Sequence, residues 1–228
     1  MDIYPLLNSL RIAAIACVIV FFLGILLAYY IKKCPRLLKG FLDVVLTLPL
    51  VLPPTVCGYI LILIFGPYQP IGQFLMRLGI VFFMDWKGAI LASALVSFPL
   101  MYRTVRASFE AFDEDLASAG KTLGLKNSYI FWRIRVPACK SGIIAGTVLT
   151  FARALGEYGA TQMFVGYTSQ TATISTTVAH LWQGDNNQEA LYWILINIAI
   201  SAVVLIIVNI FKIDFQRKAF KLFINVNL

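Results

Sequence analysis

The sequence predicts an all-α fold: a bundle of five or six membrane-spanning helices that makes the chain a polytopic membrane protein. Of its 228 residues, 60% are hydrophobic and only 13% are charged, whereas ordinary soluble domains carry about 25% charged residues. The mean hydropathy of +0.81 agrees with this composition. An ordinary soluble domain is therefore excluded, and we expect a multi-pass protein of the plasma or inner membrane.

Five apolar stretches are long enough to cross the hydrocarbon core, which takes about 20 residues as a helix. They cover residues 7–31, 41–65, 88–102, 142–165 and 190–211. The third is the shortest, so it should start earlier or continue through Arg103 and Arg106. The mixed segment 71–84 is either an interfacial helix or a short sixth span.

Three prolines lie in the second span, at Pro49, Pro53 and Pro54. Proline lacks a backbone donor and kinks helices, which membranes tolerate where neighbouring groups satisfy the freed carbonyls. The stretch is either a kinked span or a broken helix that lines a pathway, and the sequence favours neither.

The net charge of +8 is concentrated beside the apolar stretches. This placement favours the positive-inside pattern over nucleic-acid binding, and it can also attract anionic headgroups of the bilayer. Basic and non-basic loops alternate, which predicts an N-terminus outside, a C-terminus inside and a basic cytoplasmic tail at 213–228. The same alternation places segment 110–137 in the cytoplasm. The basic clusters are Lys32, Lys33, Arg36 and Lys39 after the first span, and Lys212, Arg217, Lys218 and Lys221 after the last.

Catalytic and metal-binding patterns are not evident. His180 is the only histidine and is expected in an external loop, and the four cysteines form no CxxC pair. The sequence also lacks the G-x-x-x-x-G-K-[ST] loop that binds nucleotide phosphates. We therefore expect no enzyme and no cofactor in this chain, with ATP and magnesium bound by a separate subunit if transport is energised.

The cytoplasmic segment predicts two short helices. Residues 113–115 are acidic and suit a helix N-terminus, residues 117–120 give a smooth surface of small side chains, and Gly124 ends the first helix. Asn127 or Ser128 can cap the second helix, which carries three aromatic residues. Any cytoplasmic hairpin could have this form, but the exposed small and aromatic residues favour docking to a partner.

Arg153 and Glu157 lie four residues apart near the centre of the fourth predicted span. This spacing places them on one helix face, where they can pair. Charges at this depth are costly and face protein or water. The pair is either a structural ion pair, which we favour slightly, or a pathway or gate element for an anion.

The chain resembles the permeases of molybdate ABC transporters, within the molybdate, tungstate and sulfate importers. The resemblance covers nearly the whole chain. It rests on L-P-L-V-L-P-P-T-V-C-G-Y (48–59), S-F-P-L-M-Y-R (97–103), F-A-R-A-L-G-E-Y-G-A-T (151–161) and the cytoplasmic loop. In that loop Gly124, Ile134 and Pro137 match the family spacing and Val136 replaces a leucine, but Ser118, Ala119 and Gly120 stand where Glu-Ala-Ala is frequent. An acidic role there is lost or passes to residues 113–115.

The resemblance implies a type I ABC-importer transmembrane domain over residues 7–212, with an ATPase-coupling loop at 110–137. The loop residues that it marks are Ser118, Ala119, Gly120, Gly124, Ile134 and Pro137. It also implies a second copy of the chain, two copies of an ATP-binding subunit and an extracytoplasmic oxyanion-binding protein.

Three alternatives remain open. The cargo could be sulfate, thiosulfate or tungstate instead of molybdate. The chain could be a membrane scaffold without transport, although this does not account for the loop spacing together with the proline-rich span. An intramembrane enzyme is a third class, which the lack of paired acids in the spans disfavours.

Overall fold

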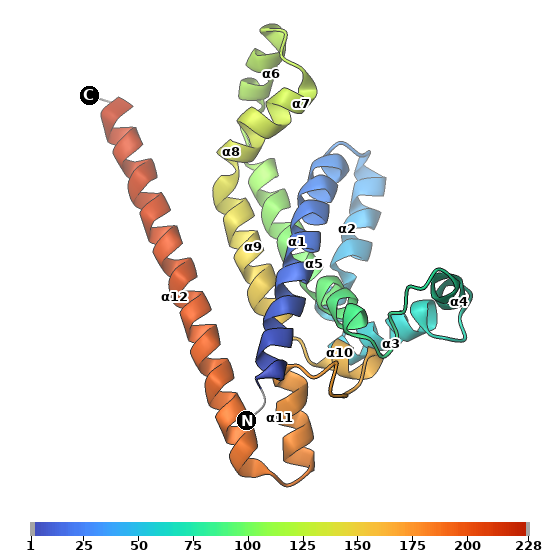
Figure 1. Cartoon of the computed structure of the whole chain (residues 1–228). Helices are drawn as coiled ribbons and strands as arrows, with labels where there is room; N and C mark the ends of the chain where they lie inside the picture. The colour runs from blue at the N-terminus through green and yellow to red at the C-terminus, as the bar shows by residue number, and fades with distance from the viewer. Residues whose placement is uncertain (1–2, 227–228) are drawn as a thin grey trace.

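The computed structural model describes residues 3–226, with side chains described for residues 3–206. Every regular element in this range is a helix, so the all-α prediction is confirmed (Figure 1). In chain order the elements are α1 (Tyr4–Lys32), α2 (Arg36–Val51), α3 (Pro54–Phe65), α4 (Pro70–Arg77), α5 (Trp86–Glu110), α6 (Glu114–Thr122), α7 (Asn127–Ile130), the π-helix η1 (Phe131–Arg135), α8 (Val136–Ala138), α9 (Lys140–Leu155), α10 (Gly159–Phe164), α11 (Ile174–Gln183) and α12 (Asn187–Val226).

Within the described part of the chain, three helices are long and apolar enough to cross a membrane: α1, α5 and the Asn187–Ile206 part of α12. Two bent helix pairs bring the number to five if each pair is one span. The number equals the predicted five. The second pair, however, joins residues 127–138, which were predicted to be cytoplasmic, to α9, so for the fourth predicted span only the part from 142 to 155 is matched by a long helix. The α4 helix has eight residues and is about 12 Å long, too short for a hydrocarbon core of about 30 Å. A sixth span at 71–84 is therefore wrong, and the interfacial alternative stands.

The second predicted span is a broken helix, not a kinked one. The α2 and α3 helices meet at an angle of 116°, and Leu52 between them is extended, with ψ 141°. Pro53 and Pro54 lack the N–H groups that would continue α2, whereas Pro49 is accommodated inside it. The chain therefore turns by more than a right angle inside the predicted span.

Two other expectations need correction. The predicted span 142–165 is not one helix, because α9 ends at Leu155 and the chain re-forms a short helix only at Gly159. His180 lies in α11 instead of a loop, where its ring stacks on Tyr167 with centroids 4.0 Å apart. The third span does continue as expected, since α5 extends through Arg103 and Arg106 to Glu110.

The bundle core is formed by α1, α5 and α9, which pack along their lengths. Small residues bring α9 close to α5: a β-carbon on Gly142 would lie 2.5 Å from that of Ser108, and one on Gly146 2.9 Å from the sulfur of Met101. The predicted small-residue face of this helix is thus used for close packing.

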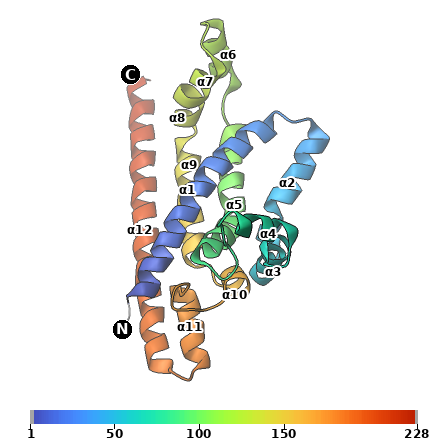
Figure 2. The ribbon, with the colours of Figure 1, turned by 45° about the vertical axis from the view of Figure 1, so that its right-hand side comes forward.

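The α12 helix stands apart along one side of the bundle and contacts mainly α11 and α9 (Figures 1 and 2). Only 11% of its apolar window is buried within the chain. Its backbone is helical through Val226, while the side chains of the predicted basic tail 213–228 lie outside the described residues.

Candidate functional site

The loop between α5 and α9 extends beyond one end of the bundle (Figures 1 and 2). It consists of α6, α7, η1 and α8, and it is the segment that the sequence marks for docking. We call residues 110–137 the coupling loop, after the role that the sequence predicts for them.

Gly124 ends α6 in the way the sequence predicts. Its φ is +77°, in the left-handed region that favours glycine. Its N–H donates to the carbonyl of Lys121, and the N–H of Leu125 donates to the carbonyl of Gly120. These two bonds form a complete Schellman motif, which satisfies carbonyls at the helix end and directs the chain back toward the bundle.

Gly120 and Ser118 have different surroundings, although the sequence grouped them into one smooth surface. Gly120 is buried, and a β-carbon there would lie 3.2 Å from Ile130 and 3.3 Å from Ile134. Its missing side chain lets α6 pack against the second half of the loop. Ser118 and Ala119 are exposed, and Ser118 lines a groove between α6 and the end of α1. The expectation of a single outward surface at 117–120 is therefore wrong.

The outward face of α6 carries leucines that sequence reasoning did not single out. Leu116 is 51% exposed and Leu123 is 79% exposed, and with Ala119 they fall on one helix face at spacings of three and four residues. The sequence signal that could have identified this face is the helical spacing of two leucines in a segment predicted to lie in the cytoplasm. They give the coupling loop an apolar outer stripe.

Pro137 lies in a helix interrupted by a π turn. In η1 the N–H of Val136 donates to the carbonyl of Phe131, five residues earlier. Proline has no N–H to give to the carbonyl four residues before it, and the π turn lies directly before this missing hydrogen bond. The helix then bends by 74° at Cys139 before α9 begins.

Glu114 connects three parts of the structure. Its carboxylate accepts hydrogen bonds from both terminal nitrogens of Arg135 in η1, at 2.8 and 2.7 Å. Lys32 at the end of α1 donates to it at 2.5 Å and to the carbonyl of Phe109 at 2.7 Å. We call Lys32, Glu114 and Arg135 the clamp, because they hold the coupling loop onto a long helix of the bundle.

The clamp favours the charged form of its carboxylate, although the Glu114 side chain is 53% exposed. Hydrogen bonds from Arg135, partly offset by burial and aided by Lys32, lower the pKa of Glu114 to about 2. The hydrogen bonds with Glu114 also raise the pKa of Arg135. Glu114 and Arg135 are therefore both charged at neutral pH. Sequence reasoning placed Glu114 among three candidates for an acidic role but assigned no role to Arg135.

The helix caps only partly match expectation. Asp113 caps α6 by accepting a hydrogen bond from the N–H of Asp115 at 2.9 Å. Neither Asn127 nor Ser128 caps the second helix, because α7 begins after Lys126 and has no side-chain cap. The acidic start of α6 still favours the helix dipole.

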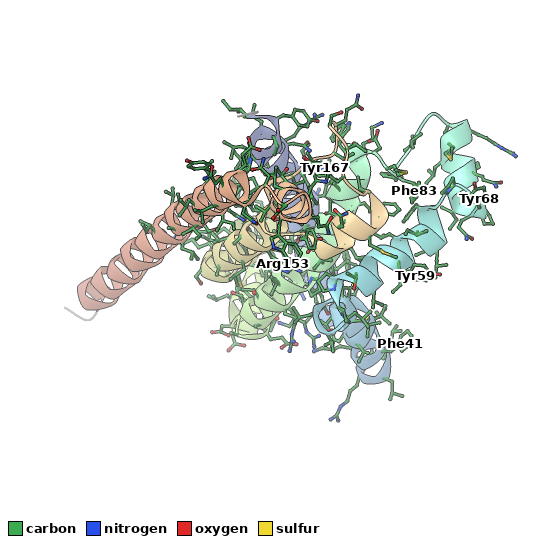
Figure 3. All side chains as sticks on the ribbon, turned by 90° about the horizontal axis from the view of Figure 1, so that it is seen from below. Phe41, Tyr59, Tyr68, Phe83, Arg153 and Tyr167 are labelled. Carbon is green, nitrogen blue, oxygen red and sulfur yellow. The ribbon has the colours of Figure 1, made fainter. Side chains whose placement is uncertain are left out.

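Arg153 and Glu157 do form an ion pair, but not within one helix. Nη1 of Arg153 lies 2.7 Å from Oε2 of Glu157, although α9 ends at Leu155. The other carboxylate oxygen accepts a hydrogen bond from the N–H of Ala160 in α10 at 2.8 Å. The Glu157 side chain is 1% exposed and that of Arg153 is 31% exposed. Glu157 thus ties α9 to α10, and Figure 3 shows Arg153 toward the middle of the molecule.

The breaks in the two spans lie against each other. A β-carbon on Gly159 would be 3.0 Å from Cβ of Pro54, and one on Gly58 would be 2.7 Å from the carbonyl oxygen of Ala160. The α3 and α10 helices therefore begin side by side with almost no side chain between them. We call residues 52–55 and 156–159 the break junction.

The comparisons with known proteins agree with this architecture. The sequence model of the family described as the binding-protein-dependent transport system inner membrane component matches residues 11–219. The chain therefore belongs to this family of membrane subunits of transport systems. One relative, the molybdenum transport system permease protein ModB of Escherichia coli (strain K12), is 41% identical over 204 residues, which are 88% of this chain and 89% of the relative.

Solved structures share the fold. A bacterial ABC transporter involved in the import of the acidic polysaccharide alginate gives a TM-score of 0.74 at 18% identity, over 92% of this chain and 78% of that chain. An alginate ABC transporter in complex with an alginate pentasaccharide-bound periplasmic protein gives 0.70 at 18% identity, over 89% and 75%. The predicted ABC-importer transmembrane fold is thus confirmed. No group of three or more His, Cys, Asp or Glu side chains that could hold a metal occurs among the described residues.

Proposed function

We propose that this chain is the permease subunit of an ATP-driven oxyanion importer, with molybdate as its cargo. The structural observation that carries the proposal is the coupling loop, which is held by the clamp and presents an apolar stripe beyond the end of the bundle. The relative named as a molybdenum permease, at 41% identity over nearly the full length, supports the choice of cargo. Tungstate, sulfate and thiosulfate are the alternative cargoes.

The coupling loop is the proposed docking site for an ATP-binding subunit. Ala119 lies on its exposed surface beside Leu116 and Leu123, and Ser118 is exposed on the neighbouring face of α6 that lines the groove toward α1. Gly120, Gly124, Ile134 and Pro137 set the shape of the loop. Buried small residues inside and apolar residues outside suit a rigid element that enters a partner's cleft. That partner would bind ATP with magnesium. In the proposed two-fold assembly, two copies of this chain contact two copies of the ATP-binding subunit.

The break junction is the proposed wall of the translocation pathway. Transporters commonly place discontinuous helices where cargo passes, because unwound backbone is tolerated there. Arg153 lies beside the junction, is one-third exposed, and has no partner other than Glu157 among the described side chains. Its free guanidinium donors suit brief contact with an oxyanion, while Glu157 keeps the net charge of the pair at zero.

The remaining partners follow from the same assembly. An extracytoplasmic oxyanion-binding protein would deliver the cargo to the side opposite the coupling loop, with the N-terminus outside and the C-terminus in the cytoplasm. A periplasmic protein is present in one of the related solved structures. The exposed apolar face of α12 would contact lipid and a second copy of the chain.

The test is reconstitution of the chain in vesicles with its ATP-binding subunit and binding protein. ATP hydrolysis and uptake are measured with molybdate, tungstate and sulfate, each presented by the binding protein. We expect molybdate uptake that depends on ATP and on the binding protein. Uptake of sulfate alone would contradict the cargo, and no uptake of any anion by a correctly assembled complex would favour the scaffold.

A matched pair of variants tests the docking site in the same vesicles. Leu123→Ser on the outer stripe should uncouple ATP hydrolysis or release the ATP-binding subunit. Leu37→Ser is the control, because Leu37 is 91% exposed but lies at the start of α2. Equal effects of both substitutions would argue against docking through the outer stripe.

A further inference from the structure

A groove lies where the coupling loop meets the end of α1. It has a volume of about 270 Å³ and is bordered by α1, α6, α7 and η1. Four cationic side chains and one carboxylate line it, which leaves a surplus of three positive charges: the cations are Lys32, Lys33, Lys121 and Arg135, and the acid is Glu114. Such a concentration of like charge favours an anion in the groove.

Two of the four cations are not used by the clamp. Lys33 and Lys121 are exposed, and neither forms an ion pair with a side chain that the structure describes. The ammonium of Lys33 lies 3.9 Å from the centre of the Tyr29 ring, which directs it over the groove without neutralising it. The groove thus offers two free ammonium groups beside a fixed guanidinium.

Beside the groove lies a second hollow of about 250 Å³, which is lined mainly by aromatic and aliphatic side chains together with Lys33, Asn127 and Ser128. The two share Tyr29, Lys33, Asn127 and Phe131, so they lie next to each other. The second hollow adds Leu26, which lies further along the membrane-spanning helix α1, together with Tyr30 and Trp132. Tyr30 is 60% exposed and Trp132 is 49% exposed.

We propose that this groove binds an anionic phospholipid, with the headgroup phosphate between Lys33 and Lys121 and the glycerol and upper acyl chain along Leu26, Tyr30 and Trp132. The site lies at the end of a membrane span, where tyrosine and tryptophan favour the interface and basic residues favour anionic lipid. A free oxyanion would gain nothing from the apolar half. The inference goes beyond transport and takes from the proposed function only the cytoplasmic placement of this end of α1.

Lipid bound there would contact both the coupling loop and a helix of the bundle, so it would brace the clamp. The acid Glu114 stays engaged with Lys32 and Arg135, and the phosphate would meet the cations on the open side of the groove. Anionic lipid would therefore stabilise the loop in its docked position relative to the bundle.

The test compares two double variants of the full-length protein in nanodiscs that contain phosphatidylglycerol and phosphatidylcholine. Bound phosphatidylglycerol is counted by native mass spectrometry after release into detergent. Lys33→Gln with Lys121→Gln should weaken phosphatidylglycerol binding about 10- to 30-fold, as expected for two lysines at a membrane surface. Arg36→Gln with Lys126→Gln removes the same charge from exposed positions near the same end but outside the groove. Equal loss in both double variants, or no loss in the first, would overturn the proposal.

A second arm separates a lipid from a small anion. Trp132→Ala should weaken phosphatidylglycerol binding several-fold but leave competition by inorganic phosphate unchanged. Tyr129→Ala is the control, exposed on the same loop and outside both hollows, and it should change neither lipid binding nor phosphate competition. If millimolar inorganic phosphate or molybdate displaces the lipid fully and Trp132→Ala has no effect, the groove is a small-anion site and the lipid assignment is wrong. Size-exclusion elution at the native position confirms that each variant is folded.

Discussion

Replacing Arg153 should destabilise the protein far more than replacing Glu157, although the two form one ion pair. The Glu157 side chain is 1% exposed and Arg153 is 31% exposed. In Arg153→Met the buried carboxylate keeps only the N–H of Ala160, and breaking a buried pair in this way costs about 3–5 kcal/mol. In Glu157→Gln the amide oxygen still accepts from Ala160 and the guanidinium can reach water, so the cost should be about 1–2 kcal/mol.

The double variant Arg153→Met with Glu157→Gln should recover most of the loss, because replacing both members of a buried pair is often close to neutral. The assay is the thermal midpoint of the purified protein in detergent, with the yield of folded protein on size exclusion as a second measure. For a domain of this size a loss of 3–5 kcal/mol corresponds to a fall of about 6–20 °C. Arg103→Met is the control, since Arg103 is exposed on α5 and forms no ion pair with the described side chains.

Two outcomes would refute this reasoning. The first is an Arg153→Met variant that is as stable as Glu157→Gln, which would mean that the carboxylate is not stranded. The second is a double variant as unstable as Arg153→Met alone. Transport then separates the two roles: near-normal uptake by a stable double variant supports a structural pair, and an assembled but inactive double variant supports a gate or pathway role.

The other predictions concern the coupling loop and the topology. Gly124→Val should lower the free energy of unfolding by about 1 kcal/mol or more and weaken co-purification with the ATP-binding subunit, because φ at this position is +77°. Gly40→Val is the control, since Gly40 also lies in open space but has no positive φ, and this variant should keep the complex. Normal recovery of the complex with Gly124→Val would show that the turn is not needed for docking. The pKa of Glu114 is lowered to about 2 from 4.5, so the stability that its charge contributes is full above about pH 4.5 and is lost as the pH falls toward 2. Glu114→Gln should abolish this acid-dependent part of the stability, measured as the unfolding midpoint against pH. An unchanged pH profile would contradict the clamp. Cysteine at position 126 should be labelled only from the cytoplasmic side and cysteine at Gln170 only from outside, and the reverse pattern would overturn the orientation.

The sequence was sufficient for features that depend on local chemistry. The apolar stretches located the long helices, and Gly124 was predicted as a helix end because left-handed backbone favours glycine. The spans that the prolines and Gly156 interrupt were harder. Two consecutive prolines are compatible with both a kink and a break, and the 116° angle depends on what α3 packs against.

Long-range partners were beyond the reach of the sequence. The clamp joins residues 32, 114 and 135, and no spacing rule relates positions 82 and 21 residues apart. The Arg153–Glu157 pair was predicted from helical spacing, and the contact is real although the helix ends between the two residues. The hydrogen bond from the N–H of Ala160 orients the Glu157 carboxylate, a role that the sequence prediction gave to a continuous helix.

Because the chain bends by 74° at Cys139, the part of the coupling loop that precedes α9 forms a lever arm on that helix. The arm, residues 127–138, is about 18 Å long at 1.5 Å per residue, so turning it by about 10° moves its far end by about 3 Å. Because the arm is nearly perpendicular to α9, a sideways push on it applies torque about the long axis of that helix. A straight continuation of the helix would have no such leverage and would only bend or slide. The break junction lies at the other end of α9, so torque entering at Cys139 reaches it through the helix as a whole.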